Sequence, residues 1–277
     1  MKRREAITLF GTAGFFGLTG FIQPAKNNSN KQPSAKKDNQ PAANNLPAMK
    51  TIGILGGLGP QATMDIEMRL HKAAQRFISP MQNSGYPPIV VQYYRHPPVL
   101  LTDQHMPVVP WQPDPRLLDT ARKLGPMADF IIIPSNGAHL FQQEIEHSAG
   151  RKVLSMIDIT LEEVKKRKWK KIGVLGMMNP KVYTSRLQEM GLEFETISDE
   201  LQLQLNQAIM KVMEGGEGDN ERAIALRAIE KLRSKQVHGI IPGCTEIPLL
   251  LGKYMDAADI INPAQLLADA AIQFAIS

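Results

Sequence analysis

The heptapeptide KTIGILG at residues 50–56 returns, with two changes, as KKIGVLG at residues 170–176. Each copy is a short apolar run that ends in glycine, a pattern typical of a buried strand leading into a tight turn. A second pair of similar blocks follows, IIIPSN at residues 131–136 and GIIPGC at residues 239–244. Because the two pairs occur in the same order at similar spacing, the chain is predicted to contain two similar halves.

Working outward from these blocks, short apolar runs alternate with amphipathic stretches along residues 50–277. Strands are predicted at residues 52–55, 88–94, 130–134, 152–157, 171–175, 192–196, 239–242 and 259–261. Helices are predicted at residues 61–77, 115–124, 139–146, 159–168, 181–190, 201–213, 220–236, 247–251 and 264–275. This alternation is typical of α/β architecture with parallel sheets. We therefore expect two pseudosymmetric three-layer α/β domains with parallel sheets, one formed by residues 49–157 plus 262–277 and the other by residues 158–261.

The first 48 residues have a different character. A basic start at Lys2–Arg4 precedes seventeen uncharged residues, 6–22, which is typical of an export signal or an N-terminal anchor over residues 1–25. The adjacent arginines resemble a twin-arginine signal, so the twin-arginine export machinery is an expected partner and the periplasm the expected location. Residues 26–48 are rich in Asn, Lys, Gln, Pro and Ala, and this composition predicts a disordered linker.

Charge and cysteine content exclude several classes of protein. Residues 1–50 hold eight Lys/Arg and two Asp/Glu, which leaves 24 basic and 25 acidic residues among the other 227. The folded part therefore has no basic excess of the kind that nucleic-acid binding needs. A single cysteine excludes an intramolecular disulfide, and the scattered histidines argue against a structural zinc site.

The strand ends indicate where a ligand should bind. Open α/β sheets bind ligands at the carboxyl ends of their strands. Two facing halves would therefore place Ser135–His139 and Cys244–Glu246 on opposite walls of one cleft between the domains.

Cys244 is the strongest chemical signal in the chain. A lone cysteine is more often an inert buried residue than a catalyst. This one follows a predicted strand and precedes a predicted helix, a position where helix amides lower the pKa of a thiol. From its position alone, catalysis and an inert role are about equally supported.

Three other features each have two interpretations. The loop Gly56–Pro60 fits a tight strand-to-helix turn as well as a site whose amides bind a carboxylate, and it lacks nucleotide-binding fingerprints. His139 fits a general acid or base, and it also fits a capping or core histidine. Arg95 follows a strand and fits a carboxylate clamp, although an exposed loop arginine is equally consistent.

Three blocks together resemble the aspartate/glutamate racemase family. Gly-Gly-Leu-Gly-Pro at residues 56–60 is similar to its N-terminal signature. Residues 134–139, Pro-Ser-Asn-Gly-Ala-His, are similar to its first catalytic block, Cys-Asn-Thr-Ala-His, and residues 243–250, Gly-Cys-Thr-Glu-Ile-Pro-Leu-Leu, to its second. The resemblance covers about residues 50–277.

The resemblance implies an isomerase that works without pyridoxal phosphate or metal. Two cysteines flank the α-carbon of an amino acid in the family, one removing the proton and the other returning one to the opposite face. Carried over to this chain, Cys244 is one of these groups, and His139 stands beside the other. In the two blocks, the residues implied to contact the amino-acid or dicarboxylate substrate are Asn136, Gly137, Thr245 and Glu246. Gly57 and Arg95 are candidate substrate-binding residues from their positions after predicted strands. Relatives often dimerise, although no interface is recognisable here.

The sequence departs from the family at Ser135, which stands where the first cysteine belongs, and at Gly137, which replaces the usual threonine. A serine hydroxyl titrates far above neutral pH, so symmetric two-thiol racemisation is not available as written. Three alternatives follow. Cys244 works with Ser135, water or His139 in an Asp/Glu-type racemase, or it serves a one-cysteine isomerase or decarboxylase, or the cleft is a non-catalytic binding site of an exported protein.

Overall fold

The computed structural model describes residues 49–78, 86–178, 180–216 and 218–277. The predicted leader at residues 1–25 and the predicted linker at residues 26–48 both precede these ranges, so both predictions lie outside the described residues. Within the described ranges, every helix is too short or too polar to serve as a membrane span.

Strands and helices alternate along most of the described chain, except that α7 follows α6 and α9 follows α8 without an intervening strand. The elements of the first part are β1 (Ile52–Gly56), α1 (Pro60–Phe77), β2 (Ile89–Tyr93), α2 (Pro115–Leu124), β3 (Phe130–Ile132), α3 (Gln142–Ala149), β4 (Val153–Leu154) and α4 (Met156–Lys166). Those of the second part are β5 (Lys171–Leu175), α5 (Lys181–Glu189), β6 (Glu193–Glu195), α6 (Asp199–Met213), α7 (Asp219–Arg233), β7 (Gly239–Pro242), α8 (Glu246–Leu251) and α9 (Pro263–Ala275). Short 3₁₀ turns lie at Gly125–Met127, Gly137–Phe141 and Gly252–Asp256.

The strands form two parallel sheets with equivalent orders. The first sheet has the order β2-β1-β3-β4 and the second the order β6-β5-β7. The repeated heptapeptides occupy equivalent places, because β1 and β5 are each flanked by the strand that follows next and by the strand after that. Ile260 extends the likeness, forming a parallel bridge to Ile240 where β4 stands in the first sheet.

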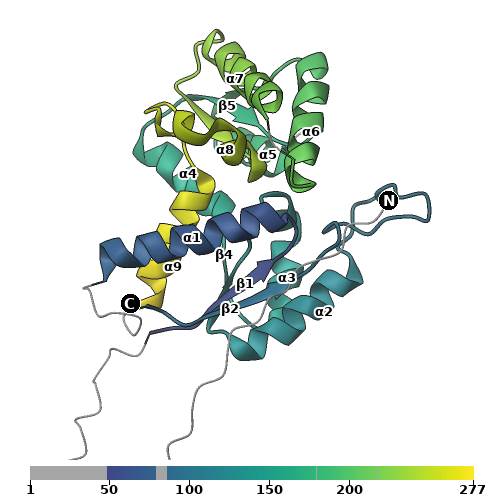
Figure 1. Ribbon diagram of the computed structural model, residues 1–277, viewed down its shortest axis with the longest axis vertical. Helices are drawn as coiled ribbons and strands as arrows, with labels where there is room; N and C mark the ends of the chain where they lie inside the picture. The colour runs from purple at the N-terminus through teal and green to yellow at the C-terminus, as the bar shows by residue number, and fades with distance from the viewer. Residues whose placement is uncertain (1–48, 79–85, 179, 217) are drawn as a thin grey trace, which may run out of the picture. The chain divides into compact units, whose positions relative to one another are not determined.

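Helices cover both faces of the first sheet (Figure 1). Alternate residues along β1 enter different cores. Ile52 and Ile54 pack with α1 and α9, while Leu55 packs with α2 and α3. This part, with β1–β4, α1, α2, α3 and α9, is called the first lobe below.

The second sheet is covered in the same way. Leu175 and Ile240 pack with α6, α7 and α8, whereas Ile172 and Val174 pack with α4 and α5. This part, with β5–β7 and α4–α8, is called the second lobe. The two layered lobes with parallel sheets confirm the predicted fold class.

Capping residues explain where several helices begin. Asp114 caps α2 by accepting from the Arg116 amide, and Pro115 occupies the first turn, where a missing N–H costs nothing. Ser155 caps α4 in the same way, and its position ends β4 after two residues. This cap is why the strand predicted at residues 152–157 is much shorter than expected.

Two further predictions need correction. The strand predicted at residues 259–261 is a single bridge at Ile260 rather than a ladder. The helix predicted at residues 139–146 begins earlier, with the 3₁₀ turn Gly137–Phe141, and continues as α3.

The two ends of the described chain meet in the first lobe. The Lys50 amide donates to the Ala275 carbonyl at 2.9 Å, and the Lys50 ammonium donates to the Phe274 carbonyl at 3.1 Å. The last helix, α9, also packs against α1 and α4. The predicted domain boundaries at residues 157–158 and 261–262 fall in the first turn of α4 and at the N-cap of α9.

Candidate active site

The predicted site residues stand just beyond strand ends. Gly57 follows β1, Ser135 follows β3 after two residues, and Cys244 follows β7 after one. Since the strands of each sheet are parallel, each residue lies at the carboxyl end of its own sheet, which is where α/β proteins bind ligands.

His139 holds the first catalytic block in shape. Its Nδ1 lies 2.8 Å from the Ser135 carbonyl oxygen, and its Nε2 accepts from the Met156 amide at 3.1 Å. Burial lowers the pKa of His139, so the ring is neutral, with its proton on Nδ1. With both ring nitrogens bonded to the backbone, the geometry favours the structural interpretation of His139 over a general acid or base.

Asn136 is linked to the second lobe through a tyrosine. The Asn136 side chain is buried, and its Oδ1 accepts from the Tyr183 hydroxyl at 2.7 Å. Its Nδ2 is buried without a hydrogen-bond partner among the described residues. An unpaired buried N–H group is uncommon in folded proteins, so this donor is available for a ligand.

Tyr183 also touches the second catalytic block. A Cβ atom placed on Gly243 would lie 2.9 Å from Cδ2 and 3.0 Å from Cε2 of the Tyr183 ring. Gly243 immediately precedes Cys244. The ring and hydroxyl of one side chain therefore join the segments that carry Ser135 and Cys244, which supports their predicted grouping in one site.

The loop after β1 is a turn that only glycine fits comfortably. Gly57 has φ +80°, and a Cβ atom there would lie 2.7 Å from the Tyr94 amide nitrogen. The Gly57 N–H donates to Thr63 Oγ1 at 2.8 Å, and that hydroxyl donates to the Gly59 carbonyl at 3.0 Å. The Gly57 amide is thus already paired, which favours the tight-turn interpretation over carboxylate binding by this N–H.

Replacing Gly57 with alanine is expected to lower the free energy of unfolding by about 3 kcal/mol. The left-handed backbone and the contact with Tyr94 each cost roughly 1–3 kcal/mol for a residue with a Cβ. Gly137→Ala is the matched control, because a Cβ atom there meets nothing within 4 Å, and its change should stay within about 0.5 kcal/mol. Urea unfolding of both variants measures the difference, and equal midpoints for the two would contradict the expectation.

The same loop reaches the second lobe at Gly59. A Cβ atom on Gly59 would lie 2.3 Å from Glu246 Oε1, so the Glu246 carboxylate lies directly against this glycine. The other oxygen, Oε2, accepts from the Cys244 thiol at 3.0 Å and from the Thr245 hydroxyl at 3.1 Å. Glu246 therefore connects the N-terminal signature with the cysteine.

The pKa of the Cys244 thiol is shifted in the direction opposite to the one predicted. Burial and the neighbouring Glu246 carboxylate raise its pKa well above the ordinary value, while the backbone N–H groups of Glu246 and Met177 act in the opposite direction. The predicted lowering by helix amides is wrong in direction, because α8 has only six residues and its first residue is itself an acid. In the resting site the thiol keeps its proton.

The remaining predicted residues occupy different surroundings. Ser135 is half-buried at the turn after β3, and Gly137 is exposed beside open space. Arg95 is exposed, with its guanidinium 5.1 Å from the centre of the Tyr93 ring. This stacking fits the exposed loop arginine, and a role of Arg95 in binding carboxylate stays a prediction.

Two residues that the sequence did not single out shape the site. Thr63 and Tyr183 are fully buried polar side chains, and each bonds to a loop of the site. Thr63 lies four residues after Gly59, within the predicted helix, and Tyr183 lies near the start of another. Tyr183 meets Asn136 and Gly243, which are distant in sequence, so a local pattern does not reveal its burial. Thr63 instead bonds to the loop just before its own helix.

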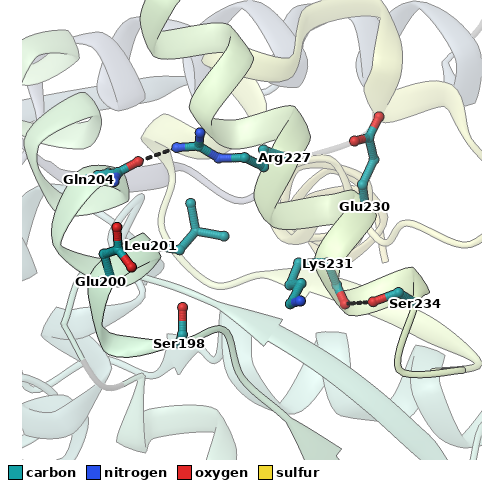
Figure 2. Close-up of a pocket in the computed structure, with 8 residues that line it drawn as sticks. All are labelled: Ser198, Glu200, Leu201, Gln204, Arg227, Glu230, Lys231 and Ser234. Carbon is teal, nitrogen blue, oxygen red and sulfur yellow. Dashed lines mark hydrogen bonds between the residues drawn. The ribbon is translucent and has the colours of Figure 1, made fainter.

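Two hollows in the described part of the chain are lined by residues other than the predicted catalytic ones. One of about 480 Å³ lies between α6 and α7, with a lining of mixed charge in which Arg227 bonds to Gln204 (Figure 2). Another of about 440 Å³ lies between α1 and the second lobe, and its lining includes Gln61 and Leu249. Since these two follow Gly59 and Glu246 within one helical turn, the second hollow borders the site.

Comparison with known proteins identifies similar sequences and similar folds. The chain is 25% identical over 225 residues to the broad specificity amino-acid racemase RacX of Bacillus subtilis (strain 168), covering 80% of this chain and 96% of that protein. Among solved structures, it resembles an aspartate racemase homologue, PH1733, from Pyrococcus horikoshii OT3, with TM-score 0.64 and 23% identity over 83% of this chain and all of that one. The aspartate racemase of Picrophilus torridus gives TM-score 0.64 and 21% identity, covering 82% of this chain and 94% of that one.

A family model ties these likenesses to the residues of the site. The model of the Asp/Glu/hydantoin racemase family matches residues 55–271, which include Gly57, Ser135–His139 and Cys244–Glu246. The match spans both lobes and most of the described chain. The chain belongs to the Asp/Glu/hydantoin racemase family.

Proposed function

We propose that this protein is a cofactor-independent amino-acid racemase of the Asp/Glu type in which Cys244 moves the α-proton. The observation that carries the proposal is the contact between the Cys244 thiol and Glu246 Oε2 at 3.0 Å, beside the N-terminal signature loop. It pairs a thiol with a base inside a site shared by both lobes. The family supports an amino acid as substrate, and RacX is described as broad in specificity.

The charges around Cys244 suit a mechanism in which the thiol loses its proton only after substrate binds. In the free site, burial and Glu246 keep the thiol protonated. The ammonium group of an amino acid placed beside Glu246 would offset that carboxylate and lower the pKa of the thiol. Glu246 Oε2 then accepts the thiol proton, and the thiolate takes the α-proton of the substrate.

The carbanion formed in this step needs donors at the substrate carboxylate. Asn136 Nδ2 is a buried donor without a protein partner, and the resemblance assigns this position to carboxylate binding. Gly137 leaves open space where relatives carry threonine, so one hydroxyl contact is replaced by room for substrate or water.

Ser135 is proposed to stand on the opposite face of the α-carbon. A hydroxyl returns a proton poorly and removes one even less readily, because its pKa lies far above that of a thiol. The two directions of racemisation are therefore expected to be unequal, with Cys244 performing the more efficient proton transfer.

Measurement of α-proton exchange in D2O tests this function. The full chain is incubated with L- and D-enantiomers of a panel of amino acids, beginning with aspartate and glutamate and including dicarboxylic acids. Deuterium with inversion of configuration supports the racemase. Deuterium with retention indicates one-sided chemistry, and loss of CO2 indicates a decarboxylase. Thermal stabilisation by a ligand without exchange would contradict catalysis and favour a binding protein.

Ser135→Cys is expected to raise the rate of inversion roughly tenfold or more. A second thiol titrates several pKa units below a hydroxyl and restores the residue that the family carries at this position. Polarimetry or chiral chromatography measures the rates from L- and D-substrate, which should become more nearly equal. Ser135→Ala is the control for loss of the hydroxyl. Equal rates for Ser135→Cys and Ser135→Ala would show that residue 135 does not face the α-carbon.

A further inference from the structure

The hydroxyl of Tyr183 lies fully buried between the two lobes. Tyr183 belongs to α5 of the second lobe, while the nearest acceptor, Asn136 Oδ1 at 2.7 Å, belongs to the first. A second oxygen, Thr160 Oγ1 in α4, lies 3.4 Å away. The hydroxyl therefore has one close hydrogen-bond partner and one more distant one.

The direction of each hydrogen bond follows from the available protons. Thr160 Oγ1 donates its proton to the Met156 carbonyl at 2.7 Å. The Tyr183 proton goes to its nearer acceptor, Asn136 Oδ1. Burial raises the pKa of Tyr183, so this proton is retained across the range in which enzymes work.

This bond fixes the orientation of the Asn136 amide. With Oδ1 turned to Tyr183, Nδ2 must point to the other side of the amide plane. There it is buried and has no protein partner among the described residues. A packed interior seldom leaves such a donor unpaired unless a ligand or water completes it.

We propose that Tyr183 is a positioning residue that turns the Asn136 amide so that Nδ2 meets the α-carboxylate of the substrate. The proposal rests on the proposed function, and it assigns a role to a residue outside the catalytic blocks. Because the Tyr183 ring also packs against Gly243, one side chain sets the carboxylate donor and supports the segment that carries the proton-transfer thiol.

Tyr183→Phe tests the proposal, since it keeps the ring against Gly243 and removes only the hydroxyl. We expect kcat/KM for α-proton exchange to fall roughly tenfold, mostly through a higher KM, because a freely rotating amide offers its donor only part of the time. Tyr254→Phe is the matched control, because that tyrosine is exposed and its variant should keep the wild-type values.

A double-mutant cycle separates positioning from packing. If Tyr183 acts through Asn136, Tyr183→Phe should cost almost nothing further in an Asn136→Ala protein. A tenfold loss in both backgrounds would overturn the proposal and leave Tyr183 a merely structural residue.

A spectroscopic readout keeps this test independent of turnover. The side-chain NH2 signals of Asn136, identified by their loss in Asn136→Ala, are recorded in full-length protein labelled with ¹⁵N-asparagine, with and without L-aspartate. Tyr183→Phe should shift these signals in the free protein, and L-aspartate should shift them in the wild type. Absence of exchange in the wild type would defeat the proposed function alone, whereas unmoved NH2 signals in Tyr183→Phe would defeat the role of Tyr183.

Discussion

Cys244→Ala should reduce α-proton exchange at least about a thousandfold. Positioned acid–base groups contribute factors of roughly 10²–10⁴, and in the proposed mechanism the thiol is the group that touches the reacting carbon. Ser135 cannot substitute for it, because a hydroxyl is a far weaker proton acceptor near neutral pH. The chain holds no second cysteine that could take over the reaction.

The measurement is deuterium incorporation at the α-carbon, followed by NMR with each enantiomer of the best substrate. Cys244→Ser is the matched variant, since it keeps the size and the hydrogen bond to Glu246 but removes the thiol. Both variants should melt close to the wild type, because Cys244 is only half-buried. Turnover that survives in Cys244→Ala at the wild-type rate would exclude Cys244 as the proton-transfer group.

Glu246→Gln should make the Cys244 thiol react faster with an alkylating reagent and should make α-proton exchange slower. Removing the carboxylate withdraws one of the two main influences that raise the pKa of Cys244, so the thiolate becomes more abundant near neutral pH. Alkylation by iodoacetamide at pH 7.5 should therefore quicken by about tenfold, the factor that corresponds to one pKa unit. Exchange should nevertheless fall roughly a hundredfold, because the variant lacks the base that we propose receives the thiol proton.

The pH profile of alkylation tests independently whether Glu246 raises or lowers the pKa of the Cys244 thiol. In the wild type, alkylation should rise with pH only beyond the ordinary range of a thiol, and in Glu246→Gln that rise should occur at lower pH. Glu200→Gln serves as the control, because Glu200 is an exposed glutamate that lines the hollow between α6 and α7. If alkylation slowed together with exchange, Glu246 would be stabilising the thiolate rather than the thiol.

Much of the fold could be predicted because its signals are local. The apolar runs at residues 52–55 and 171–175 became the central strands of two sheets, since a parallel strand covered on both faces is apolar throughout. The repeated blocks also predicted that the two lobes are equivalent, which cannot be predicted from any single strand or helix. The predictions weakened where a polar residue ended an element, as Ser155 does at β4.

The site was predictable by position and less so by chemistry. Strand ends and the racemase-like blocks predicted that Ser135, Asn136 and Cys244 share one site, and Tyr183 touches both Asn136 and Gly243, the neighbour of Cys244. The pKa of Cys244 could not be read from its place before a helix, because the sign depends on how Glu246 folds back toward the sulfur. His139 posed the same difficulty, since the Met156 amide that occupies its Nε2 lies seventeen residues away.

The closure of the first lobe by α9 bears on the order in which the chain becomes structured during synthesis. A ribosome delivers β1–β4 first and α9 last, yet α9 covers the same face of the first sheet as α1. The first lobe must therefore wait for α9 with part of its apolar face bare, whereas β5–α8 form one continuous segment. We infer that the second lobe, although it is synthesised later, completes its core before the first lobe does. The unfinished first lobe would then expose the most apolar surface to chaperones and proteases during synthesis.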